Sequence, residues 1–439
     1  MQGDIVIVGG GAGGLELACK LGRKLGPERV ALVDSRLYHV WKPSLHEVAA
    51  GTLDIHQEGL SYQMLARDCG FTFVFGAMTG LDAANRQLTV APVRAPDEGE
   101  EVLPERRIGY RALVIAVGST SNYFGVPGAR EHTISLNATE DAERFRLRLL
   151  RLLAQAQERK EHVTPGPDAG ARTGLDIVII GGGATGVELA AELREASRVY
   201  ASYGFNKLQV LRDVRITILE GAPRILAPLP ERVSAAAARL LAQRAIRVVP
   251  DCRVARIEAH QVSDNQGNTY PSDLCVWAAG IRAPEFLGSL GLPTTKGGQI
   301  EVDGHLRVQG VEHVYALGDC AACKDGHGQT VPPRAQAAHQ QADYLLKTFL
   351  HLEANRPPPD APYVYRDYGS LVSIGRENTV GNLMGSLRAS WFVEGFLARI
   401  MYTSLHLMHH QAILGSLRTG VLALARFLIR RTTPLVKLH

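Results

Sequence analysis

Two stretches of the chain share one pattern, in which a short run of β-branched residues leads directly into closely spaced glycines. The first extends from Asp4 to Glu16, and the second, from Asp176 to Glu188, repeats it almost residue for residue. In each stretch the apolar run predicts a buried strand, and the residues after the glycines predict a helix. Each stretch is therefore expected to form a strand, a tight turn and a helix.

The glycines of both stretches have the G-x-G-x-x-G spacing of dinucleotide-binding folds. The glycines at these positions are Gly9, Gly11, Gly14, Gly181, Gly183 and Gly186. Such glycines let the backbone approach a pyrophosphate, which lies at the helix N-terminus where N–H groups are free. A glycine-rich turn without a ligand is the alternative for a single motif, and the duplication argues against it.

An acidic residue ends the second predicted strand of each unit. Asp34 follows the run 30–33, and Glu220 follows the run 215–219. A carboxylate at this position bonds the ribose hydroxyls of the adenosine and repels a 2′-phosphate. We expect Asp34 to bind the ribose at the first site. At the second site we expect Glu220 to favour NADH over NADPH. The positive charge of Arg224, which is close by in the sequence, would act in the opposite direction.

Later apolar runs also end on glycine, at Gly118, Gly280 and Gly318. We expect the runs that end at Gly118 and Gly318 to return to the first site, where Asp319 would bond the ribityl or pyrophosphate part of the cofactor. Two dinucleotides that face each other imply a hydride donor and a flavin. The first site is therefore predicted to hold FAD, and the second to hold a nicotinamide dinucleotide.

The length of 439 residues suits two to three domains, and a hydrophobic content of 46% is ordinary for a globular chain. We predict an α/β fold with two Rossmann-like dinucleotide-binding domains, the two-dinucleotide flavoprotein fold, and a C-terminal membrane-anchoring region. The predicted FAD-binding domain is discontinuous and comprises 1–135 and 285–345. The predicted NADH-binding domain comprises 136–284, and the C-terminal region comprises 346–439.

Positive charge is concentrated at the C-terminus. Residues 391–439 contain six basic residues and one acidic residue, although the whole chain has a net charge of only +4. Amphipathic helices are expected at about 391–431, the first roughly at 393–411. In the second, one apolar stripe is formed by Leu417, Val421, Leu424 and Leu428, with Arg426 and Arg430 on the opposite side.

A basic amphipathic helix of this kind binds an anionic lipid surface. Packing on the body or on a second copy, as in a homodimer, is the alternative.

Upstream, strands are expected at 363–365, 371–374 and 379–380. The segment 37–51 is interpreted either as a wall of a ligand site or as a packed crossover.

No run of 18 apolar residues occurs, so we expect no transmembrane helix. The N-terminus has no signal-peptide pattern, and the scattered cysteines suit a reducing compartment.

Cys320 and Cys323 form one C-x-x-C, which could be a redox dithiol or half of a metal site. Because a second such pair is missing from the sequence, we expect neither role, and no metal. No nucleic-acid partner is expected either.

The chain resembles the type II NADH:quinone oxidoreductases, the single-chain alternative NADH dehydrogenases, most closely their proteobacterial branch. The stretches that carry the resemblance cover the whole chain and are 9–14, 39–51, 181–189, 276–281, 318–321 and 332–340. The most specific of them is Ala335-Gln-Ala-Ala-His-Gln340.

The resemblance implies roles for further residues. It places Gly10, Ala12, Gly13, Lys42 and Ala335 in the FAD site. It places Gln336 and Gln340 at the quinone pocket near the flavin, with His339 close by, although glutamines on a helix are more often surface residues. It gives Glu188 the tasks of orienting the nicotinamide and supplying protons. The alternative is a structural role, in which the dipole of the first helical turn stabilises the carboxylate. Glu16 has the matching position in the first unit, which keeps this alternative open.

The activity implied is oxidation of NADH and reduction of a membrane quinone, ubiquinone or menaquinone, through tightly bound FAD without proton pumping. The protein would lie peripherally on the cytoplasmic face of the inner membrane. A sulfide:quinone oxidoreductase or another FAD- and NAD(P)H-dependent reductase is the enzymatic alternative. A redox sensor that binds NADH at the membrane is the non-enzymatic one.

Overall fold

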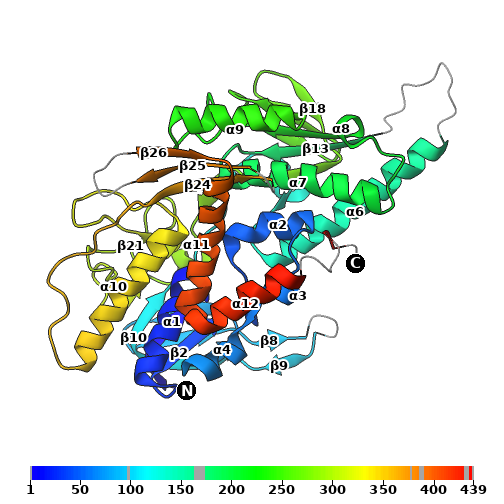
Figure 1. Cartoon of the computed structure of the whole chain (residues 1–439). Helices are drawn as coiled ribbons and strands as arrows, with labels where there is room; N and C mark the ends of the chain where they lie inside the picture. Colours follow the sequence, from blue (N-terminus) through cyan, green and yellow to red (C-terminus); the bar gives the residue numbers. More distant parts are fainter. Residues whose placement is uncertain are drawn as a thin grey trace.

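Two mainly parallel sheets lie in opposite halves of the molecule, and a small antiparallel sheet with two helices lies along one side (Figure 1). The structure is a computed structural model that describes residues 2–95, 99–162, 174–375, 378–384, 390–429 and 435–437. The predicted α/β class with two Rossmann-like units is confirmed.

The first sheet has the strand order β5-β2-β1-β10-β7-β6, and β22 pairs with β10. Its parallel strands are β1 (Gln2–Val8), β2 (Val30–Asp34), β5 (Thr72–Phe75), β10 (Arg106–Ile115) and β22 (Val314–Ala316). The antiparallel strands β6 (Met78–Asp82) and β7 (Gln87–Val90) extend it. Because residues 5–8 are buried, β1 is the apolar central strand that its β-branched run predicts.

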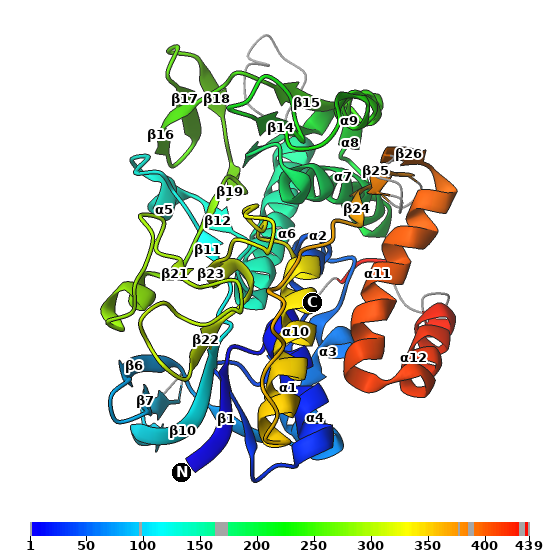
Figure 2. The same ribbon diagram turned by 90° about the vertical axis from the view of Figure 1, so that its left-hand side faces the viewer.

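Helices α1 (Ala12–Leu25) and α10 (Ala335–Glu353) pack side by side on this sheet, and α4 (Tyr62–Cys69) packs beside α1 (Figure 2). The pairing of β22 with β10 brings residues 314–316 back to the N-terminal sheet. The predicted return of the later strands to the first site is therefore confirmed.

The second sheet is parallel throughout, with the order β12-β19-β13-β14-β15. Its strands are β12 (Ile134–Ser135), β13 (Leu175–Ile180), β14 (Val214–Leu219), β15 (Ile246–Val249) and β19 (Leu274–Trp277). The helices around it are α6 (Thr139–His162), α7 (Ala184–Tyr203) and α9 (Glu231–Gln243). The short strands β11 (Thr120–Ser121) and β20 (Ile281–Arg282) pair with each other where the chain passes between the two units.

The segment 37–51 contains β3 (Tyr38–His39), a 3₁₀ turn η1 (Lys42–Ser44) and α2 (Leu45–Ala50). It leaves the first sheet, yet α2 packs against α6 and α7 of the second unit, and its apolar side chains belong to that core. After α2 come α3 (Ile55–Glu58) and β4 (Leu60–Ser61), which pairs with β3. The segment is thus a packed crossover that joins the two units.

Smaller elements complete the two units. They are β8 (Val93–Arg94), β9 (Glu101–Leu103), α5 (Ala129–His132), α8 (Val210–Asp213), β16 (Val254–Glu258), β17 (Gln261–Asp264), β18 (Thr269–Pro271), η2 (Glu285–Ser289), β21 (Ile300–Glu301), η3 (Gly318–Cys320) and β23 (Ala321–Ala322).

The C-terminal region begins with an antiparallel sheet of β24 (Gly369–Ile374), β25 (Asn378–Met384) and β26 (Ser390–Glu394). Helices α11 (Phe396–Leu414) and α12 (Ser416–Ile429) follow. The predicted helix start near residue 393 is wrong, because 390–394 pair with β25. The predicted strand 363–365 is also wrong, since the backbone of Tyr363 bonds the loop residues Gly304 and Gly326 instead of a strand.

Candidate functional site

The first glycine loop joins β1 to α1 and is closely packed on its inner side. Gly9 has φ +102°, and a Cβ there would lie 2.5 Å from the carbonyl oxygen of Ala116. A Cβ at Gly14 would lie 2.0 Å from the carbonyl oxygen of Gly9. Gly11, at the start of α1, faces open space instead. The loop therefore leaves the helix N-terminus accessible to an anionic group.

Asp34 stands at the end of β2 and holds this loop. Its Oδ2 accepts a hydrogen bond of 2.6 Å from the N–H of Gly10, and its Oδ1 accepts one of 2.8 Å from the N–H of Arg36. Burial raises the pKa of the Asp34 carboxyl. The carboxylate lies beside the glycines as the motif predicts, and the ribose contact stays a prediction.

Two residues without a role in the sequence prediction also contact the loop. The Tyr62 hydroxyl donates a hydrogen bond of 2.8 Å to the carbonyl of Gly10, and His39 Nδ1 lies 2.9 Å from the same oxygen. Tyr62 is the first residue of α4 and is buried. Its contact crosses 52 positions, so no local spacing could have indicated it.

Lys42 and Asp319 meet at the carboxyl ends of β10 and β22. Lys42 Nζ donates a hydrogen bond of 2.8 Å to the carbonyl of Ser119, whose hydroxyl donates one of 2.7 Å to Asp319 Oδ2. Burial lowers the pKa of Lys42, and the nearby Asp319 carboxylate opposes that shift. Gly118 lies next to this chain of contacts in sequence, so the predicted residues of segments far apart do come together.

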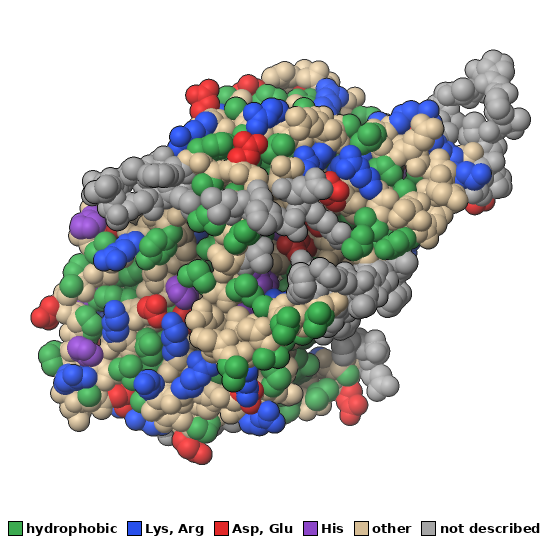
Figure 3. Space-filling model, in the orientation of Figure 1, with side chains coloured by type: hydrophobic (Ala, Val, Ile, Leu, Met, Phe, Trp, Pro, Cys, Tyr) green, Lys and Arg blue, Asp and Glu red, His purple; other side chains and the backbone are tan. Residues whose placement is uncertain are grey.

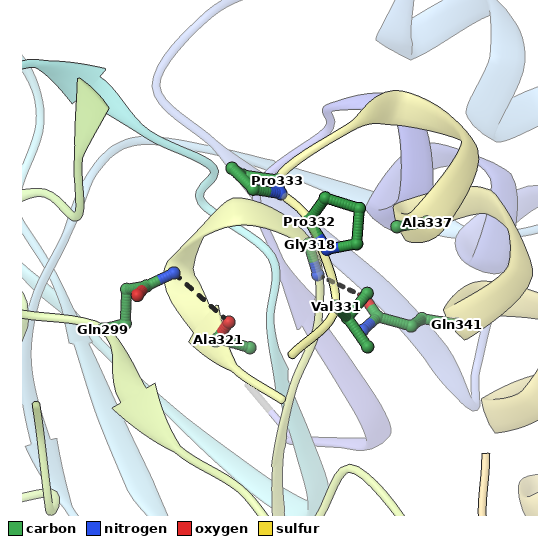
Figure 4. Close-up of a pocket in the computed structure, with 8 residues that line it drawn as sticks. All are labelled: Gln299, Gly318, Ala321, Val331, Pro332, Pro333, Ala337 and Gln341. Carbon is green, nitrogen blue, oxygen red and sulfur yellow. Dashed lines mark hydrogen bonds between the residues drawn. The ribbon is translucent and has the colours of Figure 1, made fainter. Parts of the chain in front are cut away.

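A pocket lies at the start of α10, between η3 and the segment that precedes the helix (Figure 4). Its lining residues are Gln299, Gly318, Ala321, Val331, Pro332, Pro333, Ala337 and Gln341. The N–H of Gly318 donates a hydrogen bond of 2.7 Å to Gln341 Oε1, which holds the glycine turn against α10. Gln299 and Gln341 were not predicted from the sequence, because each binds backbone groups of a distant segment.

The second glycine loop reproduces the geometry of the first. A Cβ at Gly186 would lie 2.0 Å from the carbonyl oxygen of Gly181, and Gly183 faces open space at the start of α7. Glu220 follows β14, and its Oε2 accepts a hydrogen bond of 2.5 Å from the N–H of Gly182. Glu220 and Gly182 thus correspond to Asp34 and Gly10.

The remaining residues of the second site have clear positions. Gly280 follows β19 with φ +65° and has the Phe124 ring where a Cβ would stand. The guanidinium of Arg224 donates to the carbonyl oxygens of three nearby residues, at distances of 2.7 to 3.3 Å. It is therefore engaged by its own loop rather than by Glu220.

Glu188 lies on α7, and its side chain is buried against other elements. Its Oε1 accepts a hydrogen bond of 3.0 Å from the N–H of Ser373 on β24, and the Tyr402 hydroxyl of α11 donates to the same carboxylate. His46 Nδ1 of α2 lies 3.8 Å from Oε2. Burial raises the pKa of Glu188, and its partners oppose the shift. Glu188 therefore contacts three other segments. Stabilisation by the start of its own helix does not explain these contacts.

The matching residue Glu16 has other partners. Its buried carboxylate bonds Lys20 and His339, and Lys20 also bonds Asp343 at 2.6 Å. Hydrogen bonding to Glu16 raises the pKa of His339. Within the described residues, Glu16, His339 and Asp343 form the single group with metal-ligand spacing. Lys20 already supplies a positive charge to both carboxylates there, which disfavours a metal ion.

Gln336 and Gln340 share one face of α10 and bind the segment 366–369. Gln340 donates a hydrogen bond of 2.8 Å to the carbonyl of Arg366 and accepts one of 3.0 Å from its N–H. Gln336 donates one of 3.2 Å to the carbonyl of Gly369. The structure therefore brings the two glutamines together and directs His339 towards Glu16.

Cys320 and Cys323 are free and buried. Burial raises the pKa of Cys320 to about 12 and that of Cys323 to about 11. Because the thiolate is the reactive form, neither side chain has the surroundings of a redox cysteine. The absence of a redox role for the pair stays a prediction.

The predicted apolar stripe of α12 is exposed, since Leu417, Val421, Leu424 and Leu428 are each more than half accessible, and hydrophobic side chains gather over this helix (Figure 3). Arg426 lies on the side opposite the stripe, as predicted, but this side faces the body, where Arg426 pairs with Glu58 of α3 instead of with lipid head groups. Arg430 lies outside the described residues. No helix in the described parts of the chain combines the length and hydropathy needed to cross a bilayer.

Comparison with known proteins gives consistent results. A family model described as pyridine nucleotide-disulphide oxidoreductase matches residues 3–342. The chain is 36% identical to a type II NADH:quinone oxidoreductase of Haemophilus influenzae, over 99% of this chain and 100% of that protein.

Two solved structures share the fold at 19% identity. Plasmodium falciparum NDH2 in complex with NADH has a TM-score of 0.82 and full coverage of both chains. The sulfide:quinone oxidoreductase of Aquifex aeolicus has a TM-score of 0.71, over 94% of this chain and 92% of that one.

Proposed function

The chain belongs to the pyridine nucleotide-disulphide oxidoreductase family and, within it, to the type II NADH:quinone oxidoreductases, and we propose that it oxidises NADH and reduces a membrane quinone through FAD. The observation that carries this proposal is the pair of equivalent glycine loops, each braced by a carboxylate: Gly10 by Asp34, and Gly182 by Glu220. A single chain with two such loops can hold a hydride donor and a flavin together.

The first loop has the features that FAD requires, since Gly11 leaves the helix N-terminus open and Lys42 lies beside Asp319. FAD would be held without a covalent bond by Gly9, Gly10, Gly11, Ala12, Gly13, Gly14, Asp34, Lys42, Gly118, Gly318, Asp319 and Ala335. When bound, FAD accepts two electrons as hydride and passes them on.

The proposed domains are 1–135 with 285–345 for FAD, 136–284 for NADH, and 346–439 for the C-terminal region.

NADH would bind at the second loop through Gly181, Gly183, Gly186, Glu188, Glu220 and Gly280. The Glu220 carboxylate faces the loop, and Arg224 is engaged by backbone carbonyls. A 2′-phosphate would therefore meet the negative charge of Glu220, and Arg224 is already bound to its own loop. We infer a preference for NADH over NADPH from this arrangement.

The quinone, ubiquinone or menaquinone, would contact the face of α10 that carries Gln336 and Gln340. To reach it, the quinone has to enter beside the segment 366–369, which both glutamines bind. The exposed apolar stripe of α12 would lie on the anionic surface of the inner membrane, peripherally on its cytoplasmic side. We propose that no protons are pumped, and that any homodimer leaves this face free.

One experiment tests the proposed function. The purified full chain is expected to have a flavin absorbance spectrum that NADH bleaches and a short-chain quinone restores. Steady turnover with NADH and quinone would exclude a sensor without catalysis. Bleaching by sulfide instead of NADH would contradict the proposal in favour of sulfide:quinone oxidoreduction, whose fold this chain shares.

A further inference from the structure

The ring of Phe124 lies on the backbone of Gly280, which follows β19, and most of the ring is exposed. It occupies the space that a Cβ of Gly280 would need, and Gly280 has φ +65°, so both the ring and the backbone conformation require glycine there. Phe124 is 64% exposed, the largest value among the Phe, Tyr and Trp side chains that the structure describes. The ring is therefore placed on an open face at the carboxyl end of the second sheet.

The backbone of Phe124 is held in a strained conformation. Phe124 has φ +50°, and among the described Phe, Tyr and Trp residues it alone lies in the left-handed region. Asn122 fixes it, because the Asn122 Oδ1 accepts a hydrogen bond of 3.0 Å from the Phe124 N–H. The backbone N–H of Asn122 donates one of 3.2 Å to the Gly280 carbonyl, and its carbonyl accepts one of 2.9 Å from Trp277 Nε1. Strain that neighbouring residues enforce is typical of functional positions.

The position of Gly280 in the second sheet indicates which part of a bound dinucleotide would be near Phe124. β19 and β14 are the two neighbours of β13 and lie on opposite sides of it. Glu220 follows β14, and Gly183 lies at the start of α7, which follows β13. With its adenosine ribose at Glu220 and its pyrophosphate at Gly183, NADH would extend towards β19. The nicotinamide half would therefore lie beside Gly280.

The segment 119–124 connects this position with the first site. The Ser119 hydroxyl donates a hydrogen bond of 2.7 Å to Asp319 Oδ2, which belongs to the proposed FAD site. The next residues form β11, which lies near the end of β19 and leads to Phe124 (Figure 2). Because a hydride passes only between groups in contact, the nicotinamide has to point towards the flavin. Phe124 thus lies on the segment that joins the two sites.

We propose that Phe124 contacts NADH directly, and that its ring packs against the face of the nicotinamide that the flavin leaves free. The inference rests on the proposed function and adds a substrate-contacting residue to it. One face of the nicotinamide has to meet the flavin, so the opposite face is available to the protein. Aromatic rings in such a pair prefer offset-stacked or edge-to-face contact. Shielding of Gly280 alone would not explain why the ring is kept exposed on a strained backbone.

The test measures binding to the FAD-loaded full chain by isothermal titration calorimetry, with NAD⁺ and ADP-ribose as probes. ADP-ribose has the adenosine and the pyrophosphate of NAD⁺ but lacks the nicotinamide ring. Phe124→Ala is expected to raise the Kd of NAD⁺ by about tenfold and to leave the Kd of ADP-ribose unchanged. Phe124→Tyr keeps an aromatic ring and should keep the Kd of NAD⁺ within about twofold.

Stopped-flow absorbance gives a second measure. In Phe124→Ala the NADH concentration that half-saturates flavin reduction should rise by about tenfold, whereas reoxidation by a short-chain quinone should not change. Leu211→Ala is the matched control, because it removes an exposed apolar side chain on α8 of the same unit, and it should change neither quantity.

Phe124→Gly separates the effect of the ring from that of the backbone. Glycine adopts φ +50° readily, so this variant removes the ring together with the strain. We expect the same loss of NAD⁺ affinity as in Phe124→Ala. Normal NAD⁺ affinity in Phe124→Gly would show that the ring is not the contact, and would overturn the inference.

Equal weakening of NAD⁺ and ADP-ribose in Phe124→Ala, or no change in either, would also overturn the inference while leaving the proposed function intact. A FAD-loaded full chain that never passes electrons from NADH to quinone would overturn both.

Discussion

The Nε2 atoms of His39 and His409 lie 2.9 Å apart, which joins helix α11 to the first glycine loop. His39 Nδ1 lies 2.9 Å from the carbonyl oxygen of Gly10, which can only accept a hydrogen bond. His39 therefore carries its proton on Nδ1 and accepts one from His409 at Nε2. The Trp41 ring packs on His409 at 4.2 Å between centroids.

This pair makes the protein sensitive to acid. Burial lowers the pKa of His39 from 6.5 to about 4 and that of His409 well below 6.5. Between these values the unfolded chain binds more protons than the folded one, so the free energy of unfolding should fall as pH falls from about 6.5 to 4. Urea unfolding at several pH values measures the slope.

His409→Gln is expected to flatten that slope and to cost about 1 kcal/mol at neutral pH, because one buried hydrogen bond weakens. The exposed His260 provides the control, and His260→Gln should leave the slope unchanged. If His409→Gln shows the slope of the unsubstituted chain, the protonation argument is wrong.

Nucleotide choice should depend on Glu220. Glu220→Arg is expected to raise kcat/KM for NADPH by about tenfold, since a cation replaces the carboxylate that repels a 2′-phosphate. It should also weaken NADH binding, because the hydrogen bonds to the Gly182 and Ala222 N–H groups are lost. Steady-state kinetics with both nucleotides measures this. Equal use of NADPH and NADH by the unsubstituted enzyme would refute the ribose argument.

Arg224→Gln is the companion variant. Because its guanidinium donates to backbone carbonyls of its own loop, we expect lower stability and an unchanged ratio of NADPH to NADH activity. A selective loss of NADPH activity would instead identify Arg224 as a phosphate ligand.

Membrane binding should depend on the stripe of α12. Replacing Leu417 and Leu424 by Ser is expected to reduce binding to anionic vesicles by about tenfold or more per residue, because each leucine contributes about 1.5–3 kcal/mol when buried. Reduction of a soluble dye by NADH should persist. Leu352→Ser, at an exposed leucine of α10, is the control. Unchanged co-sedimentation of the double variant would exclude α12 as the anchor.

Point substitutions are better here than removal of residues 391–439. Strand β26 pairs with β25, and His409 reaches the first glycine loop. The Lys437 N–H donates to the carbonyl of Gly51 at 2.7 Å. A truncation would therefore damage the body together with the membrane surface.

The cysteine pair should be dispensable. Cys320→Ala with Cys323→Ala is expected to keep kcat with NADH and quinone within about twofold, since neither thiol is in its reactive form. Stability should fall by about 1–2 kcal/mol, as for other buried truncations. Loss of quinone reduction with FAD still bound would indicate a redox role and favour a sulfide-type mechanism.

Much of the fold was predictable because its signals are local. The β-branched runs, the glycine spacing and the acids after the second strands lie within single units, so both Rossmann-like units and their glycine loops could be found from sequence. The apolar stripe of α12 was predictable for the same reason, since helical periodicity alone places Leu417 and Leu424 on one face.

Contacts between distant segments were not predictable. Tyr62 reaches Gly10, His409 reaches His39, and Tyr402 reaches Glu188 only because separate units pack together. The partner of Arg426 has the same origin, since a helical wheel places Arg426 opposite the apolar stripe, whereas only the packing of α12 shows that this side faces Glu58.

By itself the sequence predicted where two nucleotides would bind, because a strand, a glycine turn, a helix and an acid encode that geometry within residues 4–34 and again within 176–220. The tertiary structure alone decided which side chains surround Glu188 and the first loop. Their partners come from elements up to several hundred positions away, and burial there shifts the pKa values of Glu188, His39 and His409.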